Sequence, residues 1–239
     1  MHVKRVAFLV VICLTPVPLR PQEPSLNAGT SANSQAPGEA TLGERLAHEY
    51  ERRIGIGSTP ELDGISRYIN SVGSKVASAL PPGVQYHFLF DPNPDFKSAF
   101  ALPGGWIIVG GGLLALTQTE DELAGALAHE IEHVALGQVS RRVSELARHK
   151  EIGKLEVNEF YPGYTKEDEL ACDLNGQKLA AKAGYSPAGM LTLLETFKAL
   201  AKGEPEEPSD EHPTLSERIV QAGPLARATS QSQKPLRIP

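Results

Sequence analysis

The chain has 239 residues, of which 41% are hydrophobic, and this is enough for one domain with a sizeable core. A net charge of −6 and a sequence pI of about 5.7 argue against nucleic acid as a partner. A mean hydropathy of −0.22 argues against a polytopic membrane protein.

Residues 1–20 predict either a secretory signal peptide or a short N-terminal anchor. Lys4 and Arg5 form a basic start, and the apolar run VAFLVVICL that follows is too short to span a bilayer but long enough for a signal sequence. No clear Ala-x-Ala cleavage site follows, so an uncleaved anchor, and with it association with a membrane, stays open. Ile12 before Cys13 fits a lipoprotein site poorly. We expect an exported protein, periplasmic or extracellular.

Two helices are predicted at the start of the folded part. Residues 21–40 are rich in Pro, Ser, Asn and Gly and predict a disordered linker, after which folded structure begins near Thr41. Amphipathic helices are expected at 42–55 and 60–80, because apolar residues recur there at helical spacing.

The period of the apolar residues then changes to that of β-structure. Residues 84–90 (VQYHFLF) predict a strand, and residues 98–109 predict a β-hairpin with Pro103-Gly104-Gly105 in its turn. Three glycines at 110–112 then allow the backbone to enter a short helix at 113–116. Together with the helices that follow, these elements predict a mostly helical α+β fold with a small sheet.

The next helix carries the motif HEIEH. Thr119 is suited to be its N-cap, and Glu122, three residues on, completes a capping box. His129 and His133 are four residues apart, so both imidazoles project from one face of the helix and can bind one zinc ion. Glu130 lies beside them, in position to activate a zinc-bound water as a general base.

Two simpler explanations of this motif are a chance occurrence among the seven histidines and a solvated polar helix face. The flanking residues Leu123, Leu127 and Ile131 are apolar, which indicates a buried helix instead. Buried imidazoles and a buried carboxylate need a partner that offsets their lost hydration, and a metal ion is the simplest one.

A third protein ligand is expected, because catalytic zinc usually takes three and leaves a fourth position open. The spacing HExxHxxGxxH is excluded, since Leu136 and Val139 occupy the positions of its Gly and its last His. A Glu from a later helix is the other common solution, and Glu169 can provide it. Asp173 shares the face of Glu169 and would accept a hydrogen bond from a ligand histidine. Cys172 is expected to point away from this face as a small buried hydrophobic residue.

Periodicity and composition predict the structure of the remaining segments. Helices are predicted at 139–150, 165–183, 187–201 and 215–221. Residues 151–164 have no clear pattern and are expected to form a mobile segment near the site, and residues 203–213 an acidic, Pro-rich loop. The tail at 223–239 has little core-forming content and predicts a flexible end. Without the signal segment Cys172 is the remaining cysteine, so no intramolecular disulfide is expected.

Several pieces of the chain, in this order, resemble one family of zinc metallopeptidases. They are AFALPGG at 99–105, GLL at 112–114, the HEIEH helix, Glu169-x-x-x-Asp173, AGYSP at 183–187, His212-Pro213 and Arg218. The family includes HtpX-type and BepA-type bacterial peptidases, the CAAX prenyl endopeptidases and the mitochondrial Oma-type peptidase. The resemblance covers roughly residues 42–222.

The resemblance implies a single zincin-like metallopeptidase domain at 41–222, with a small sheet or hairpin beside the active-site helix. It implies that His129, His133 and Glu169 bind one zinc ion per chain and that Glu130 is the catalytic base. Members of the HtpX and CAAX types carry several membrane spans, and BepA-type members carry a helical repeat domain. Neither is expected here, so specificity and partners do not carry over from the family.

The resemblance also implies roles for residues outside the zinc motif. Ala99, Phe100 and Ala101 would form an edge strand to which a polypeptide substrate adds through backbone hydrogen bonds. His212 matches a histidine that can occupy the open zinc position in BepA-type members, while a role in stabilising the His-Pro turn is equally open. Arg218 would pair with a carboxylate of the site or with the oxyanion of the substrate carbonyl.

We therefore expect a zinc-dependent endopeptidase that hydrolyses peptide bonds of unfolded or misassembled envelope proteins. The alternative is a zinc-containing, chaperone-like protein of the cell envelope that binds such proteins without cutting them, against which the intact Glu130 argues. A deformylase-like amide hydrolase would need a cysteine ligand before the two histidines, where the mature chain has none. Polypeptides are the expected partners, and the sequence leaves the oligomeric state open.

Overall fold

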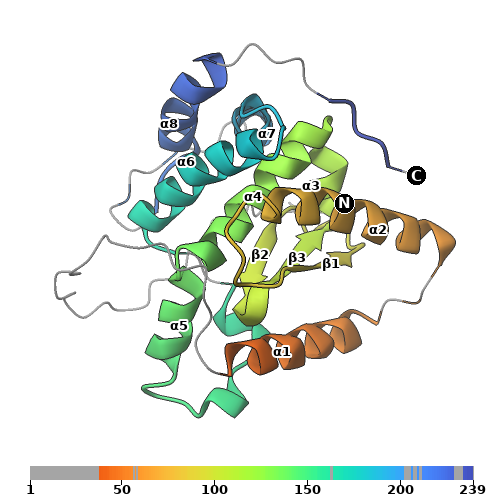
Figure 1. Ribbon diagram of the computed structural model, residues 1–239, viewed down its shortest axis with the longest axis vertical. Coiled ribbons are helices and arrows are strands. Elements are labelled where there is room, and N and C mark those ends of the chain that lie inside the picture. Colours follow the sequence, from red (N-terminus) through yellow and green to blue (C-terminus); the bar gives the residue numbers. More distant parts are fainter. Residues whose placement is uncertain are drawn as a thin grey trace, which may run out of the picture.

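A three-stranded sheet with the strand order β1-β3-β2 lies at the centre of the computed structural model (Figure 1). The structure describes residues 38–238 except 56, 58, 162–163, 202–205, 207–208, 210–211 and 229–233. The predicted signal segment and almost all of the predicted linker therefore lie outside the described residues. The strands are β1 (His87–Asp91), β2 (Ala99–Leu102) and β3 (Trp106–Gly110).

The pairing of the strands confirms the hairpin and shortens the first strand. β2 pairs antiparallel with β3, as predicted, and β1 pairs parallel with β3. The predicted strand at 84–90 begins only at His87, because His87 is paired with Trp106, the first residue of β3. β2 has a partner on one side, so it forms an edge of the sheet.

The hairpin turn depends on two glycines. Gly104 and Gly105 have φ angles of 77° and 80°, in the left-handed region that favours glycine. A Cβ atom at Gly105 would lie 2.4 Å from the backbone oxygen of Gln85. Backbone approaches the turn from the other side as well, since a Cβ at Gly43 would lie 1.8 Å from the oxygen of Pro103.

Helices cover both faces of the sheet (Figure 1). α1 (Glu39–Ile54) packs on one face, where Leu46 and Tyr50 join Leu89 and Ile108 in a hydrophobic cluster. α2 (Pro60–Ala77) and α4 (Glu120–Ala135) pack on the other face. α1 begins three residues earlier than predicted, inside the expected linker, because its first turn packs beside the hairpin turn and Glu39 accepts a hydrogen bond from Ser140.

α4 is the central helix of the molecule, and α3 (Gly111–Leu116) leads into it. The Thr119 side chain accepts a hydrogen bond from the backbone N–H of Glu122 at 3.2 Å, which confirms the predicted N-cap. Leu123, Leu127 and Ile131 are fully buried, as their apolar pattern predicted. After Gly137, which has a φ angle of 71°, the chain continues into α5 (Gln138–Leu146).

The segment without a clear sequence pattern packs against the α1 side of the sheet. Its two 3-10 turns are Ile152–Lys154 and Val157–Glu159. Leu155, Val157 and Phe160 are buried in the same cluster as Leu46 and Tyr50 of α1. The apolar residues of this segment are too irregularly spaced to reveal a helix or strand in the sequence.

Three further helices complete the fold: α6 (Lys166–Lys182), α7 (Ala188–Leu200) and α8 (Leu215–Ala228). α8 runs seven residues beyond the predicted end at Gln221, into the expected tail. The tail residues are small rather than large and apolar, yet Ala222 and Ala226 are buried. Small side chains allow close packing that a search for large apolar residues overlooks.

The arrangement as a whole is the mostly helical α+β fold that the sequence predicted, with α4, α6, α7 and α8 on one side of the sheet (Figure 1). In the part of the chain that the structure describes, no helix combines the length and the apolar character needed to cross a bilayer.

Candidate metal centre

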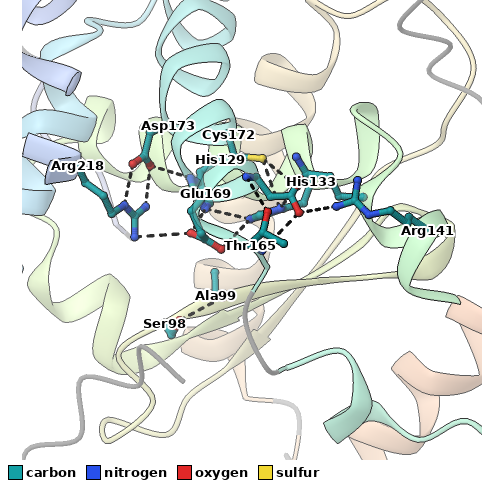
Figure 2. A network of polar contacts seen from close by, with 12 residues as sticks. Ser98, Ala99, His129, His133, Arg141, Thr165, Glu169, Cys172, Asp173 and Arg218 are labelled. Atoms are coloured by element: carbon teal, nitrogen blue, oxygen red, sulfur yellow. Dashed lines mark hydrogen bonds and ion pairs between the residues drawn. The ribbon is translucent and has the colours of Figure 1, made fainter. Parts of the chain in front are cut away.

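Two adjacent helices bring together the three predicted metal ligands. α4 carries His129 and His133, and α6 carries Glu169 (Figure 2). The Nε2 atoms of the two imidazoles lie 3.1 Å apart. The carboxylate oxygens of Glu169 lie 3.4 Å from Nε2 of His129 and 3.7 Å from Nε2 of His133. The three side chains therefore converge on one point.

These distances fit a zinc ion. Ligand atoms about 2.0–2.1 Å from a tetrahedral zinc ion are about 3.3 Å from one another, close to the three separations found here. Among the described residues, His129, His133 and Glu169 form a group in which all three donor atoms lie within 4.8 Å of one another. Two imidazole nitrogens and one carboxylate are the ligand set of many catalytic zinc sites.

Each imidazole is held by a polar partner on its other nitrogen. Nδ1 of His129 lies 2.9 Å from Oδ1 of Asp173, an ion-pair contact rather than a well-directed hydrogen bond. Nδ1 of His133 lies 2.5 Å from the amide oxygen of Gln138. Both partners favour a proton on Nδ1, which leaves Nε2 of each ring as the atom that can bind a metal ion.

The charges of the ligand residues are strongly coupled. Burial alone lowers the pKa of His129, but the carboxylates of Asp173 and Glu169 outweigh it and raise this pKa to about 10. Burial and the positive charge of His129 lower the pKa of His133 to about 4. Burial acts to raise the pKa of Glu169, but the two histidines and Arg218 lower it to about 2. In the absence of a metal, the cluster thus holds one imidazolium beside an ionised Glu169.

Asp173 links the cluster to α8. It is fully buried, and its two oxygens accept hydrogen bonds from Nε and Nη2 of Arg218 at 2.7 and 2.6 Å. Nη1 of Arg218 also lies 3.8 Å from Glu169. Burial acts to raise the pKa of Asp173, but Arg218 and His129 hold it below the usual range. Arg218 therefore pairs with site carboxylates, one of the two roles considered for it (Figure 2).

Glu130 lies on the cleft side of α4, next to the ligands. It is 9% exposed and lines the cleft together with Ala99 and Phe100 of β2. Burial raises the pKa of Glu130 to about 7, because it removes the water that stabilises the charged form.

A cleft of about 220 Å³ opens over this cluster. The metal ligands and Glu130 line it, together with Ala99 and Phe100 of β2, His212 and Arg218. His212 thus faces the same cleft but is not part of the group close enough to share one ion. Figure 2 shows Ala99 on the strand that passes the ligands.

Residues 65–157 match the model of peptidase family M48. This part of the chain is similar to the M48 peptidases. The match includes α4 with its two histidines and Glu130, but it ends before Glu169. The family implies a metal cofactor, and the site formed by the three ligand residues provides a place for it.

Curated relatives of this chain carry the names of proteases. The chain is 26% identical over 226 residues to the beta-barrel assembly-enhancing protease of Escherichia coli (strain K12), a match that covers 81% of this chain and 45% of the relative. It is 24% identical over 199 residues to metalloprotease LoiP of the same strain, covering 74% and 76% of the two chains. A shorter match of 61 residues, 43% identical, covers 26% of this chain and 16% of the mitochondrial metalloendopeptidase OMA1 of Schizosaccharomyces pombe. The chain spans about half the length of the assembly-enhancing proteases it matches.

The structure adds two residues beside the predicted metal ligands. Gln138, which contacts His133, was not expected, because it follows the break in the helix at Gly137 and no helical spacing connects it with the motif. Cys172 is buried as expected, but it does not point away from the site. Its Sγ lies 3.4 Å from Nδ1 of His133 and 3.3 Å from the amide oxygen of Gln138. Cys172 is three residues after Glu169, a spacing that places both on one helix face.

One aromatic residue covers His133. The ring of Tyr164, just before α6, stacks on the imidazole with centroids 4.0 Å apart and an interplanar angle of 22°. This contact restricts the rotation of the ring about its side-chain bonds. Tyr164 belongs to the segment that was expected to be mobile near the site, and it is the part of that segment in contact with the ligands.

Proposed function

We propose that this chain is a zinc-dependent endopeptidase that binds one zinc ion through His129, His133 and Glu169. The observation that carries the proposal is the convergence of two Nε2 atoms and a carboxylate at separations of 3.1 to 3.7 Å, beside a buried Glu130 in an open cleft. A zinc ion held at such a site supplies Lewis-acid chemistry, polarising a carbonyl group and acidifying water.

Glu130 acts as the general base and then as the general acid in this proposal. Its carboxylate takes a proton from the attacking water while the water oxygen bonds to the scissile carbonyl carbon. The same proton passes to the leaving amine as the C–N bond breaks. The position of Glu130 in the lining of the cleft, beside the predicted ligands, supports this role.

The substrate is proposed to bind along β2. Gly110 donates a backbone hydrogen bond to the carbonyl of Ser98 at 3.0 Å, so in the antiparallel ladder the backbone groups of Ala99 and Ala101 point to the free edge. Phe100, between them, points its backbone groups toward β3. A polypeptide in extended form can add at Ala99 and Ala101 through backbone hydrogen bonds, which do not depend on its sequence.

Asp173 and Arg218 are proposed to orient the site. Asp173 holds His129 with Nε2 toward the ion, and Arg218 balances the charge of Asp173 and of Glu169. Arg218 is already occupied by two hydrogen bonds to Asp173, which favours this role over a direct contact with the oxyanion. His212 lines the cleft and is proposed as a fourth ligand, at the open position of the ion, when no substrate is present.

Unfolded or misassembled envelope proteins are the proposed substrates, and an exported location, periplasmic or extracellular, the proposed site of action. The name of the beta-barrel assembly-enhancing proteases, to which the chain is similar, supports a substrate in the cell envelope. The apolar N-terminal run with its basic start supports export. An extended edge strand suits an unfolded chain, because a folded protein has few free strands to offer.

The variant Glu130→Gln tests the enzymatic proposal. It keeps the shape of the side chain but cannot accept the proton, so cleavage of casein is expected to fall by about 100-fold or more while one zinc per chain is retained. Glu132→Gln is the matched control, because Glu132 is equally buried on α4 but does not line the cleft. If the purified original chain bound zinc and unfolded casein but did not cleave the casein, the result would instead support the chaperone-like alternative.

A further inference from the structure

One side of the metal cleft is formed by apolar residues of α7. Met190, Leu193, Leu194, Phe197 and Leu200 all line the cleft, and Leu215 of α8 joins them. They follow the spacing of one helix face, whereas the charged Glu195 and Lys198 of α7 do not line the cleft. α7 thus contributes no charged residue to the lining of the cleft among the residues that the structure describes.

This apolar wall begins one helical turn from the catalytic position. Ala126, which lines the cleft, precedes Glu130 by four residues on α4. α7 lies directly against this part of α4, since a Cβ atom at Gly125 would come within 2.9 Å of the backbone nitrogen of Met190. The other end of the ligand cluster, at His133, is closed by Tyr164. The apolar wall is therefore on one defined side of the metal ligands.

The depth of this wall suits a large side chain. Met190, Leu193, Leu194 and Leu215 are at most 4% exposed, so they form the floor, and Leu200 is 43% exposed at the rim. A charged or strongly polar side chain placed there would lose its hydration without a partner, whereas an apolar one would bury more of its surface.

We infer that the α7 wall is a specificity subsite, which accepts a large apolar side chain of the polypeptide next to the bond that is cut. The inference rests on the proposed endopeptidase activity and adds the substrate class to it. Neighbouring side chains of an extended peptide point in opposite directions. The side chain of one residue beside the scissile bond can therefore pack against the α7 wall while the peptide backbone follows β2.

The test is the cleavage pattern of unfolded casein, with new termini identified by mass spectrometry. At one position beside the cleaved bonds, Leu, Met and Phe are expected to be enriched over their frequency in casein. A peptide with Leu at that position is expected to show a kcat/KM at least about tenfold above its Ser counterpart, as hydrophobic pockets discriminate by such factors. Leu200→Lys places a cation at the rim and is expected to reduce this ratio and to admit acidic residues.

Val220→Lys is the matched control, because Val220 is 74% exposed on α8 and does not line the cleft. Its cleavage pattern is expected to equal that of the original chain. Phe197→Ala, which enlarges the space beside the α7 wall without adding a charge, should shift the preference toward larger aromatic residues. Unchanged melting temperatures of the three variants would show that they fold.

The outcomes separate the inference from the activity on which it rests. Cleavage with no apolar bias, or a bias that Leu200→Lys and Phe197→Ala both leave unchanged, overturns the subsite while the endopeptidase assignment stands. If the zinc-loaded original chain cleaves casein no faster than the Glu130→Gln variant, both the proposed activity and the subsite are overturned.

Discussion

The amide oxygen of Gln138 lies 2.5 Å from Nδ1 of His133, on the side of the ring opposite the atom that faces His129 and Glu169. The contact joins the first residue of α5 to the last turn of α4 across the break at Gly137. A hydrogen bond at this nitrogen determines which tautomer of the imidazole is present, and thus which nitrogen can bind a metal.

Gln138→Met is expected to weaken zinc binding about 10- to 100-fold, because it removes the acceptor while keeping a side chain of similar length. The affinity can be measured by competition with a chromophoric chelator. Gln138→Glu restores an acceptor and should recover most of the affinity. Gln85→Met, at an exposed position away from the cleft, is the control. Equal zinc affinity of Gln138→Met and the original chain would show that the contact has no orienting role.

Arg218→Ala is expected to destabilise the fold by about 3–5 kcal/mol, because it leaves the fully buried Asp173 without its cationic partner. Urea unfolding in the presence of a chelator measures this cost separately from metal binding. Arg141→Ala removes a partly exposed pair with Asp168 and should cost at most about 1 kcal/mol. Similar costs for the two variants would contradict the assignment of Arg218 to a buried network.

Removal of zinc is expected to lower the melting temperature, since a ligand that binds the folded state stabilises it by an amount that grows with its concentration. The two Nε2 atoms lie 3.1 Å apart beside a carboxylate, so the folded state provides a formed site for the cation and loses its binding free energy when the cation is removed. Calorimetry with added zinc and after chelation checks this. The melting temperature of His133→Ala should change little when zinc is added. If the melting temperature of the original chain also did not depend on zinc, the result would argue against the site.

Gly176→Ala is expected to cost about 1–3 kcal/mol and to weaken zinc binding. A Cβ atom at this position of α6 would lie 3.0 Å from the backbone nitrogen of His129, so the two helices would have to move apart. The movement would draw Glu169 away from the histidines of α4. Gly153→Ala is the control, since no atom lies within 4 Å of a Cβ there. Denaturant unfolding and zinc titration of both variants test the expectation.

Local features of the site could be predicted from the sequence because they depend on the geometry of a single helix. The spacing of His129 and His133, the N-cap at Thr119 and the burial of Leu127 all follow from the helical repeat and its end effects. The same rule, applied to Glu169 and Cys172, would have placed the thiol on the ligand side. The expectation that Cys172 points away from the ligands was therefore wrong, although the helical repeat itself predicts the observed position.

The sequence by itself determined that two imidazoles lie on one helix face with a carboxylate beside them, and that the fold combines several helices with a small hairpin. Only the tertiary structure decided that Glu169, thirty-six residues after His133, reaches the same point, and that Gln138 and Arg218 support it. Periodicity reports which face of a helix is buried but carries no information about the partner of that face. The partner depends on the close approach of α4 and α6, which the backbone contact at Gly176 permits.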